Sequence, residues 1–215
     1  MKVSIIISVY NGEKFISRAI RSCLEQSMKK EDYEIIVIND GSTDNTGQIL
    51  SSFDRDLIKV ITLDKNMGLP FACNMGIKKA FGRFVVRVDA DDYVHEDFLK
   101  VGYLYLSMDL DINAVAFDYH LVDEIEDKVK RMSAEENPIA CGIFFRKDYL
   151  IDIGLYDPEF RLGEDEDLRI RFLKKYSIEN VKLPLYRYHL HGNNSTNNIE
   201  GVKLYKQKLK QKHNI

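Results

Sequence analysis

Short apolar runs rich in β-branched residues alternate with longer segments of helical periodicity over the first 120 residues of the chain. The apolar runs occupy residues 3–9, 35–38, 57–63 and 84–88. The helical patterns occupy residues 15–24, 49–53, 69–81 and 98–106. Apolar runs of this kind are typical of strands buried on both faces, and parallel strands are joined by right-handed crossovers. The sequence therefore predicts an α/β fold with a mainly parallel sheet and helices on both of its faces.

The second part of the chain shows a less regular pattern. Residues 114–119 and 139–146 resemble strands, and a helix is expected from Glu164 to Phe172. The charge-dense segment 123–136 is either a mobile loop or a hairpin. A length of 215 residues corresponds to one large domain or to one domain with an appendage.

The C-terminal tail, residues 201–215, is rich in lysine. It contains Lys203, Lys206, Lys208, Lys210 and Lys212 and no acidic residue. This pattern favours a solvated terminal helix, and contact with an anionic membrane surface is the alternative.

Charge and cysteine content exclude several classes of protein. Lysine and arginine number 31 against 34 acids, a net charge of −3, whereas a nucleic-acid-binding protein normally has a basic excess. No stretch approaches the 18 or so apolar residues that span a membrane. Cys23, Cys73 and Cys141 are far apart in apolar surroundings, which favours reduced, buried thiols. We therefore expect a cytoplasmic protein, with peripheral attachment to the inner face of the membrane as the alternative.

Small and polar residues follow each of the four apolar runs directly. These segments are residues 10–12, 39–44, 64–68 and 89–92. The carboxyl ends of parallel strands meet at one edge of the sheet, where open α/β folds bind ligands. Turn formation accounts for the Asn-Gly and Asp-Gly-Ser sequences. It does not account for three carboxylates within four residues, at Asp89, Asp91 and Asp92.

This aspartate cluster indicates a site for a divalent metal or a substrate. Unpaired carboxylates so close together repel one another and raise each other's pKa. Carboxylate oxygens suit Mg²⁺ or Mn²⁺, which keep few protein ligands and complete their shell with water and substrate phosphates. Capping of the following helix is the alternative, and it accounts for one or two of the three acids.

A second acidic cluster, residues 164–167, directly precedes a helical pattern. Stabilisation of a helix dipole is one interpretation. A general base is the other, because repulsion among four consecutive acids raises the pKa of one of them toward neutrality. His189 and His191 follow near the end of the chain as surface or hydrogen-bonded histidines, or as ligands that complete a metal site held mainly by aspartates.

Five segments resemble, in their order and spacing, the family 2 glycosyltransferases of the Rossmann-like GT-A fold. They read Ser-Val-Tyr-Asn (8–11), Asn-Asp-Gly-Ser-Thr-Asp (39–44), Asn-Met-Gly-Leu (66–69), Asp-Ala-Asp-Asp (89–92) and Gly-Glu-Asp-Glu-Asp (163–167). Each motif alone is unspecific, but together they extend the resemblance over nearly the whole chain. It implies a nucleotide-sugar-binding half at 1–120 and an acceptor-side half at 121–200, which contains the catalytic base, within one compact domain.

The resemblance implies a nucleoside-diphosphate sugar as donor, with a uridine nucleotide as the expected type. Val9 and Tyr10 would flank the base, Asp40 would accept a hydrogen bond from it, and Asn66 would line its pocket. Asp89 would contact the ribose. Asp91 would coordinate the Mn²⁺ or Mg²⁺ that bridges the diphosphate.

For the chemical step, the resemblance implies one displacement with inversion at the anomeric carbon. Asp165 matches the catalytic base, and Glu164 would help to position the acceptor, a glycan or a lipid-linked molecule. His191 is similar to the late histidine that closes the metal site, although His189 is an alternative.

The sequence departs from the family at Cys73, where relatives often have an arginine before Asn74. It also contains no Q-x-x-R-W segment, which favours addition of a single sugar over processive synthesis. A catalytically silent sugar-nucleotide-binding domain is the main alternative. A sugar nucleotidyltransferase is a weaker one, because the segment after the first strand is not a glycine-rich basic loop.

Overall fold

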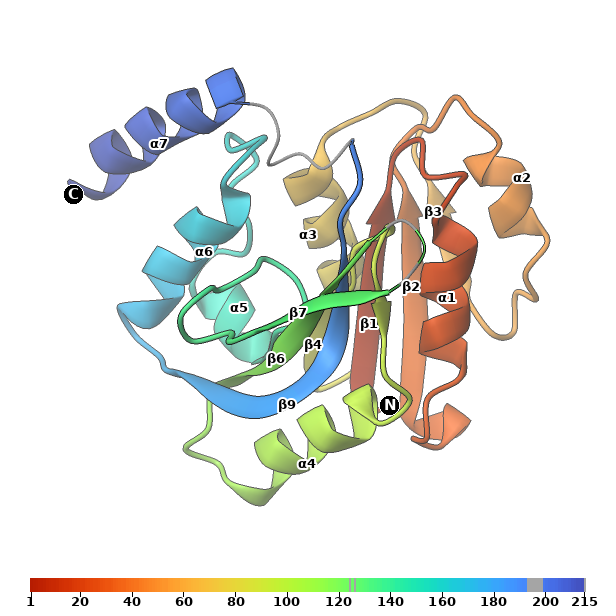
Figure 1. The fold of residues 1–215 in the computed structure, drawn as a ribbon, viewed down its shortest axis with the longest axis horizontal. Coiled ribbons are helices and arrows are strands. Elements are labelled where there is room, and N and C mark those ends of the chain that lie inside the picture. Colours follow the sequence, from red (N-terminus) through yellow and green to blue (C-terminus); the bar gives the residue numbers. More distant parts are fainter. Residues whose placement is uncertain (124, 126, 193–198, 215) are drawn as a thin grey trace.

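The computed structural model describes residues 1–123, 125, 127–192 and 199–214 (Figure 1). Its first half confirms the predicted alternation of strands and helices. The strands are β1 (Val3–Val9), β2 (Tyr33–Asn39), β3 (Lys59–Thr62) and β4 (Phe84–Arg87). Between them lie α1 (Ile16–Leu24), the 3₁₀ turn η1 (Lys30–Asp32), α2 (Thr46–Ser51) and α3 (Leu69–Lys79).

These four strands pair in parallel in the order β3-β2-β1-β4. Ile5 of β1 pairs with Ile35 of β2 on one side and with Val86 of β4 on the other. The chain moves outward from β1 to β3 and returns on the other side with β4, so the strand order reverses at β1. In open α/β sheets, the crevice at such a reversal binds ligands.

The second half extends the same sheet. Its elements are β5 (Tyr93–Val94), α4 (Phe98–Met108), β6 (Ala114–Val122), β7 (Lys128–Met132), β8 (Phe144–Arg146), α5 (Lys147–Asp152), α6 (Glu164–Leu173), β9 (Ile178–His189) and α7 (Ile199–His213). Within the described residues, the sheet continues from β4 in the order β8-β6-β9-β5, and β7 pairs with β6. Every antiparallel pair includes a strand of this half, and the pair of β4 with β8 joins the two halves. The predicted α/β class is confirmed.

Three details differ from the sequence-based expectation. Only the last part of the predicted strand at 139–146 forms a strand, β8, and the charged segment 123–136 contributes β7, which pairs antiparallel with β6. The long strand β9 had no predicted counterpart. In the first half of β9 the side chains of Glu179 and Lys182 are exposed, and Pro184 interrupts the alternation of buried and exposed residues.

Helices cover both faces of the sheet. On one face, Ile20 of α1 and Phe98 of α4 pack with Ile5. On the other, α3, α5 and α6 cover Ile6, with Phe172 of α6 in the same core. Gly102 permits the close approach of α4, because a Cβ there would lie 2.6 Å from the Phe144 ring.

The C-terminal tail forms the predicted helix, α7, which lies outside these layers and next to α6 (Figure 1). It is not simply solvated, because Leu209 is buried and Lys212 pairs with Asp167. None of the described helices combines the length and the apolarity that crossing a membrane requires. Cys23, Cys73 and Cys141 are free and buried, as predicted.

Candidate active site

A cavity of about 250 Å³ opens at the carboxyl ends of β1 and β2, where the sequence predicts a ligand site. It is lined by Ser8, Val9, Tyr10, Asp40, Asn66, Gly68, Leu69, Ala72 and Arg161. The structure thus brings together the four residues expected around a nucleotide base, namely Val9, Tyr10, Asp40 and Asn66. Sites for whole small ligands measure about 300–1,000 Å³, so this cavity suits one part of a larger ligand.

Asp40 shapes one wall of the cavity. Its carboxylate is buried and accepts the backbone N–H groups of Met67 at 2.7 Å and Gly68 at 2.9 Å. Gly68 has a positive φ of 95°, which glycine adopts without strain. Asp40 therefore fixes the loop after β3 against the end of β2. Each carboxylate oxygen keeps a second lone pair that a ligand can use.

The three aspartates after β4 lie in different surroundings. Asp89 accepts hydrogen bonds from Arg87, whereas Asp91 lies beside His191. Asp92 is buried and accepts the Tyr186 hydroxyl at 2.7 Å and the His189 backbone N–H at 2.8 Å. Burial raises the pKa of Asp92 well above its usual range, and the charges of Asp91 and Asp89 add to the effect. Mutual repulsion is therefore present as predicted, but it is secondary to burial.

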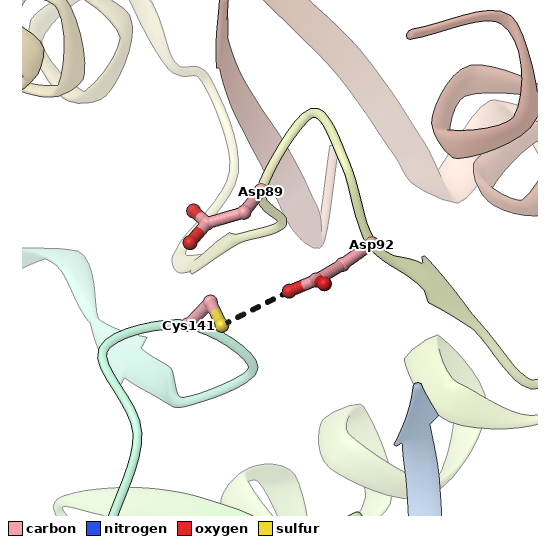
Figure 2. Close-up of side chains that lie close together, drawn as sticks. All are labelled: Asp89, Asp92 and Cys141. Carbon is pink, nitrogen blue, oxygen red and sulfur yellow. Dashed lines mark hydrogen bonds between the residues drawn. The ribbon is translucent and has the colours of Figure 1, made fainter. Parts of the chain in front are cut away.

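Asp89, Asp92 and Cys141 place their ligand atoms within 4.8 Å of one another. The Cys141 thiol is directed at the Asp92 carboxylate, 3.5 Å away (Figure 2). Asp92 is already bound by Tyr186 and by the backbone of β9, and burial raises the pKa of the Cys141 thiol well above its usual range. The cluster of Asp89, Asp92 and Cys141 therefore joins the loop after β4 to strand β9, and we assign no metal to this cluster.

Asp91 and His191 form the pair with the chemistry of a metal site. The His191 Nε2 atom lies 2.8 Å from the Asp91 Oδ2 atom, although the two residues are 100 positions apart. Both side chains are partly exposed, and a carboxylate with an imidazole suits Mn²⁺ or Mg²⁺ when phosphate oxygens and water complete the shell. The ring of His189 is buried and packs 5.0 Å from that of Phe15. Of the two histidines, His191 is thus the one paired with Asp91.

The four acids of the first turn of α6 differ in their hydrogen-bond and ion-pair partners. Glu164 accepts a hydrogen bond from Arg87, and Glu166 accepts one from Tyr205. Asp167 is paired with Arg171, Lys212 and His213. The side chain of Asp165 makes no hydrogen bond or ion pair with the described residues. The fold therefore accounts for three of the acids and leaves Asp165 available for chemistry.

The raised pKa expected in this acidic cluster occurs at Glu164. Burial raises its pKa, the Arg87 guanidinium offsets part of that effect, and the charge of Asp165 adds to it. Asp165 itself lines a separate crevice of about 10 Å³ with Leu168 and Arg169.

Arg87, at the end of β4, was not predicted as a site residue. Its guanidinium is buried and bonds both oxygens of Asp89 and, at 3.0 Å, the Glu164 Oε1 atom. Burial alone would lower the pKa of Arg87, but the two carboxylates raise it well above its usual value. One side chain thus connects the loop after β4 with the start of α6. A charged residue within an apolar run was the available signal, because a buried charge requires a partner.

Arg161 was also missed, although it lies in the loop before α6, two residues ahead of the Gly-Glu-Asp-Glu-Asp motif. It lines the 250 Å³ cavity and makes no hydrogen bond or ion pair with the described residues. The hydroxyl of Ser8, which lines the cavity, lies 3.4 Å from the Cys73 thiol, whose pKa burial raises to about 11. Cys73 itself lines a neighbouring crevice of about 10 Å³, whereas Arg161 brings a cation to the larger cavity.

The predicted residues that do not line this cavity are Asp89, Asp91, Glu164, Asp165 and His191. Asp91 pairs with His191, and Asp89 and Glu164 are both bound to Arg87. Asp165 joins neither group and lines the separate crevice on α6. All of these groups lie at the carboxyl edge of the sheet or on α6, which Arg87 ties to that edge.

Comparison with known proteins gives a consistent result. The profile of glycosyl transferase family 2 matches residues 4–168. Poly(ribitol-phosphate) beta-N-acetylglucosaminyltransferase TarS of Staphylococcus aureus is 40% identical over 102 residues, which are 46% of this chain and 18% of that protein. An uncharacterized glycosyltransferase of Rickettsia felis is 29% identical over 210 residues, which are 91% of this chain and 34% of that protein. The matched part of the chain thus spans only 18% and 34% of the length of these two curated relatives.

Solved structures share the fold. A crystal structure of S. aureus TarS with UDP-GlcNAc superposes with a TM-score of 0.80 at 24% identity, over 92% of this chain and 61% of that one. A mannosyltransferase of Pyrobaculum calidifontis with GDP-Man and Mn²⁺ gives a TM-score of 0.71 at 19% identity, over 90% of this chain and 58% of that one. These values confirm the GT-A type of α/β architecture.

Proposed function

Because the chain belongs to glycosyl transferase family 2, we propose that it transfers one sugar from a nucleoside-diphosphate sugar to an acceptor hydroxyl, with inversion at the anomeric carbon. The observation that carries the proposal is the 2.8 Å contact between Asp91 and His191. These residues come from distant parts of the chain and have the side chains that a metal-bound diphosphate requires. A chance surface contact would not be expected to join the two residues that the family resemblance assigns to one metal.

The donor base occupies the 250 Å³ cavity, where the exposed ring of Tyr10 stacks on it and Asp40 accepts a hydrogen bond from it. Asn66 lines the base pocket, and Asp89 contacts the ribose. We take the nucleotide to be uridine diphosphate, because TarS is 40% identical over the 102 matched residues and has been crystallised with UDP and with UDP-GlcNAc.

Asp91 and His191 would hold the divalent cation, Mn²⁺ or Mg²⁺. When bound, the cation neutralises the charge that develops on the departing diphosphate, which is usually the largest electrostatic contribution to such a reaction. Arg87 keeps Asp89 fixed beside this pair from within the fold.

Asp165 acts as the general base. It removes the proton of the acceptor hydroxyl as the oxygen attacks the anomeric carbon, and the bond to the diphosphate breaks on the opposite face. This single displacement inverts the anomeric configuration. Glu164, held by Arg87, lines the acceptor side next to the base.

The acceptor is a glycan or a lipid-linked molecule, and the outward face of α7 supports attachment at a membrane surface. Lys203, Lys206 and Lys210 are exposed and make no ion pair with the described residues, and Leu204 between them is 70% exposed. Basic residues beside an apolar one favour an anionic lipid surface. We expect the chain to sediment with anionic vesicles but not with neutral ones, and replacement of these three lysines by glutamine to abolish the difference.

The direct test of the proposed reaction uses labelled sugar nucleotides with Mn²⁺ or Mg²⁺ and measures sugar transfer and UDP release. Turnover that stops when EDTA removes the metal supports the proposal. Binding of UDP without any turnover indicates the alternative, a catalytically silent sugar-nucleotide-binding domain. If the chain neither binds nor turns over any of the donors, both the transferase and the silent binding domain are overturned.

A further inference from the structure

The contacts of α7 concentrate on one short stretch of the chain, residues 157–167. This stretch contains the loop that carries Arg161 and the first turn of α6, with Glu164 and Asp165. In Figure 1, α7 lies apart from the sheet and next to α6. Most of its surface is exposed, so it adds little to the hydrophobic core.

The first of these contacts is made by Tyr205. Its ring covers Gly163, the N-cap residue of α6, so closely that a Cβ at position 163 would lie 2.3 Å from the Tyr205 Cδ2 atom. Gly163 has a φ of 74°, so a larger residue would be strained there as well as blocked. The Tyr205 hydroxyl donates to the Glu166 Oε1 atom at 2.9 Å. One side chain thereby holds both the start of the helix and the residue after Asp165.

The second contact is an ion-pair cluster around Asp167, whose side chain is fully buried. Lys212 Nζ lies 2.6 Å from Asp167 and 2.7 Å from Asp157, and His213 Nε2 lies 2.8 Å from Asp167. Burial opposes the charge of Asp167, but these partners and Arg171 hold its pKa below the usual value. Burial likewise opposes the charge of Lys212, and its two carboxylate partners raise its pKa.

Asp165 therefore lies between residues that are each fixed from outside α6. Glu164 is bound to Arg87 of β4, whereas Glu166 and Asp167 are bound to α7. We propose that α7 is a positioning element for the catalytic base: Tyr205 and Lys212 hold the first turn of α6 so that Asp165 keeps the orientation needed for transfer. This inference rests on the proposed function, in which Asp165 is the base.

A positioning role makes a kinetic prediction that a purely stabilising role does not. Small displacements of a reacting group reduce the rate strongly, whereas substrate binding elsewhere is unaffected. We expect Tyr205→Phe and Lys212→Gln each to lower kcat about tenfold. The KM for the donor and the Kd for UDP with Mn²⁺ should stay within about twofold of the unmodified chain, because the substitutions leave the cavity lining intact. Lys212→Arg, which keeps the charge, should restore most of the rate.

The experiment measures UDP release at a temperature where circular dichroism shows every variant to be folded. Tyr105→Phe and Lys174→Gln are the matched controls, since both residues are exposed and neither side chain forms a hydrogen bond or ion pair in the described structure. Both controls should match the unmodified chain. In an Asp165→Asn background, Tyr205→Phe should cause no further loss, because residues that act through one group are not additive.

Three outcomes would overturn the inference. They are unchanged kcat in Tyr205→Phe and Lys212→Gln, an equal loss in the two control variants, and a full additional loss in the Asp165→Asn background. If the unmodified chain shows no transfer with any donor, the proposed function fails instead, and the two failures are thus distinguished.

Discussion

Asp165 has charged neighbours on both sides, yet each neighbouring carboxylate is bound by another residue of the fold. The carboxylate of Asp165 differs from these neighbours, because it has no partner among the described residues. This difference predicts the effect of replacing Asp165. Asp165→Asn removes the proton acceptor but keeps the size of the side chain, so sugar transfer should fall by roughly a hundredfold to ten-thousandfold, the usual contribution of a general base. UDP should bind unchanged, as measured by calorimetry.

The matched control for Asp165→Asn is Glu179→Gln, since Glu179 is an exposed acid without a hydrogen bond or ion pair in the described residues. It should retain full activity. An Asp165→Asn variant as active as the unmodified chain would show that the base lies elsewhere, whereas loss of UDP binding would show that the residue serves the donor site.

Arg161 gives a prediction about the donor. Arg161 lines the cavity proposed for the donor base, and its side chain pairs with no carboxylate of the described residues, so we expect its charge to bind the diphosphate where the donor leaves that cavity. A charge-assisted hydrogen bond contributes about 1.5–3 kcal/mol, and Arg161→Gln should therefore weaken UDP binding by roughly 10-fold to 150-fold. Uridine, which lacks the diphosphate, should bind equally to both forms in the same titration.

The control for this variant is Arg55→Gln, because Arg55 lines a different cavity, between α2 and β3. It should leave both affinities unchanged. If Arg161→Gln weakens uridine and UDP alike, the arginine contacts the base or ribose and the assignment to the diphosphate is wrong.

Individual site residues differ in how far the sequence could predict their place. Asp40, Asn66 and Asp91 lie in the loops that follow β2, β3 and β4, and parallel pairing brings the ends of these strands to one edge whatever the details of packing. Arg161 belongs to an irregular loop, whose path depends on tertiary contacts that no local pattern encodes. Arg87 carried a signal, the charge within an apolar run, but its partner Glu164 lies 77 positions away.

At the level of elements, β9 is held to the loop after β4 by a buried polar contact. The Tyr186 hydroxyl donates to Asp92, and the Asp89 backbone N–H donates to the same hydroxyl. Tyr186→Phe leaves both groups without this partner inside the protein, which costs about 1–3 kcal/mol per buried group. We expect a loss of unfolding free energy of that order, measured by urea denaturation.

Tyr149→Phe serves as the control for this element. The Tyr149 ring stacks on Tyr176, and its hydroxyl has no hydrogen-bond partner in the described structure, so the loss should stay below about 0.5 kcal/mol. Equal stabilities of Tyr186→Phe and the unmodified chain would show that water replaces the lost partner.

The elements of the first half could be predicted because β1, β2 and β4 are continuous buried apolar runs and each helix has one apolar stripe. The edge strand β3 is largely exposed, but it too lies within an apolar run of the sequence. β9 escaped prediction for the opposite reason. Val181 is buried whereas Glu179 and Lys182 are exposed, and Pro184 stands within the strand, so neither period 2 nor a continuous apolar run is present. Its place in the sheet comes from pairing with β6, a contact between distant segments.

Over the whole molecule, the candidate site is assembled from both halves of the chain. The cavity combines strand ends of the first half with Arg161, and the metal pair combines Asp91 with His191. Arg87 ties β4 to α6, and α7 holds α6 from the outside. Any ligand that bridges these parts should stabilise the fold as a unit, because binding adds to the free energy of unfolding.

This coupling leads to a prediction for metal removal. UDP at about 100 times its Kd should add about 2.7 kcal/mol in the presence of Mn²⁺, which raises the melting temperature of a chain of this size by roughly 5–11 °C. EDTA should remove most of that increase, and so should His191→Gln, because the imidazole is one of the two proposed metal ligands. His120→Gln is the control, since His120 lies on β6 outside the proposed metal site and should keep the full increase. An equal UDP-dependent shift with Mn²⁺ and with EDTA would mean that the diphosphate binds without a cation, and Asp91 with His191 would then have to hold the leaving group by other means.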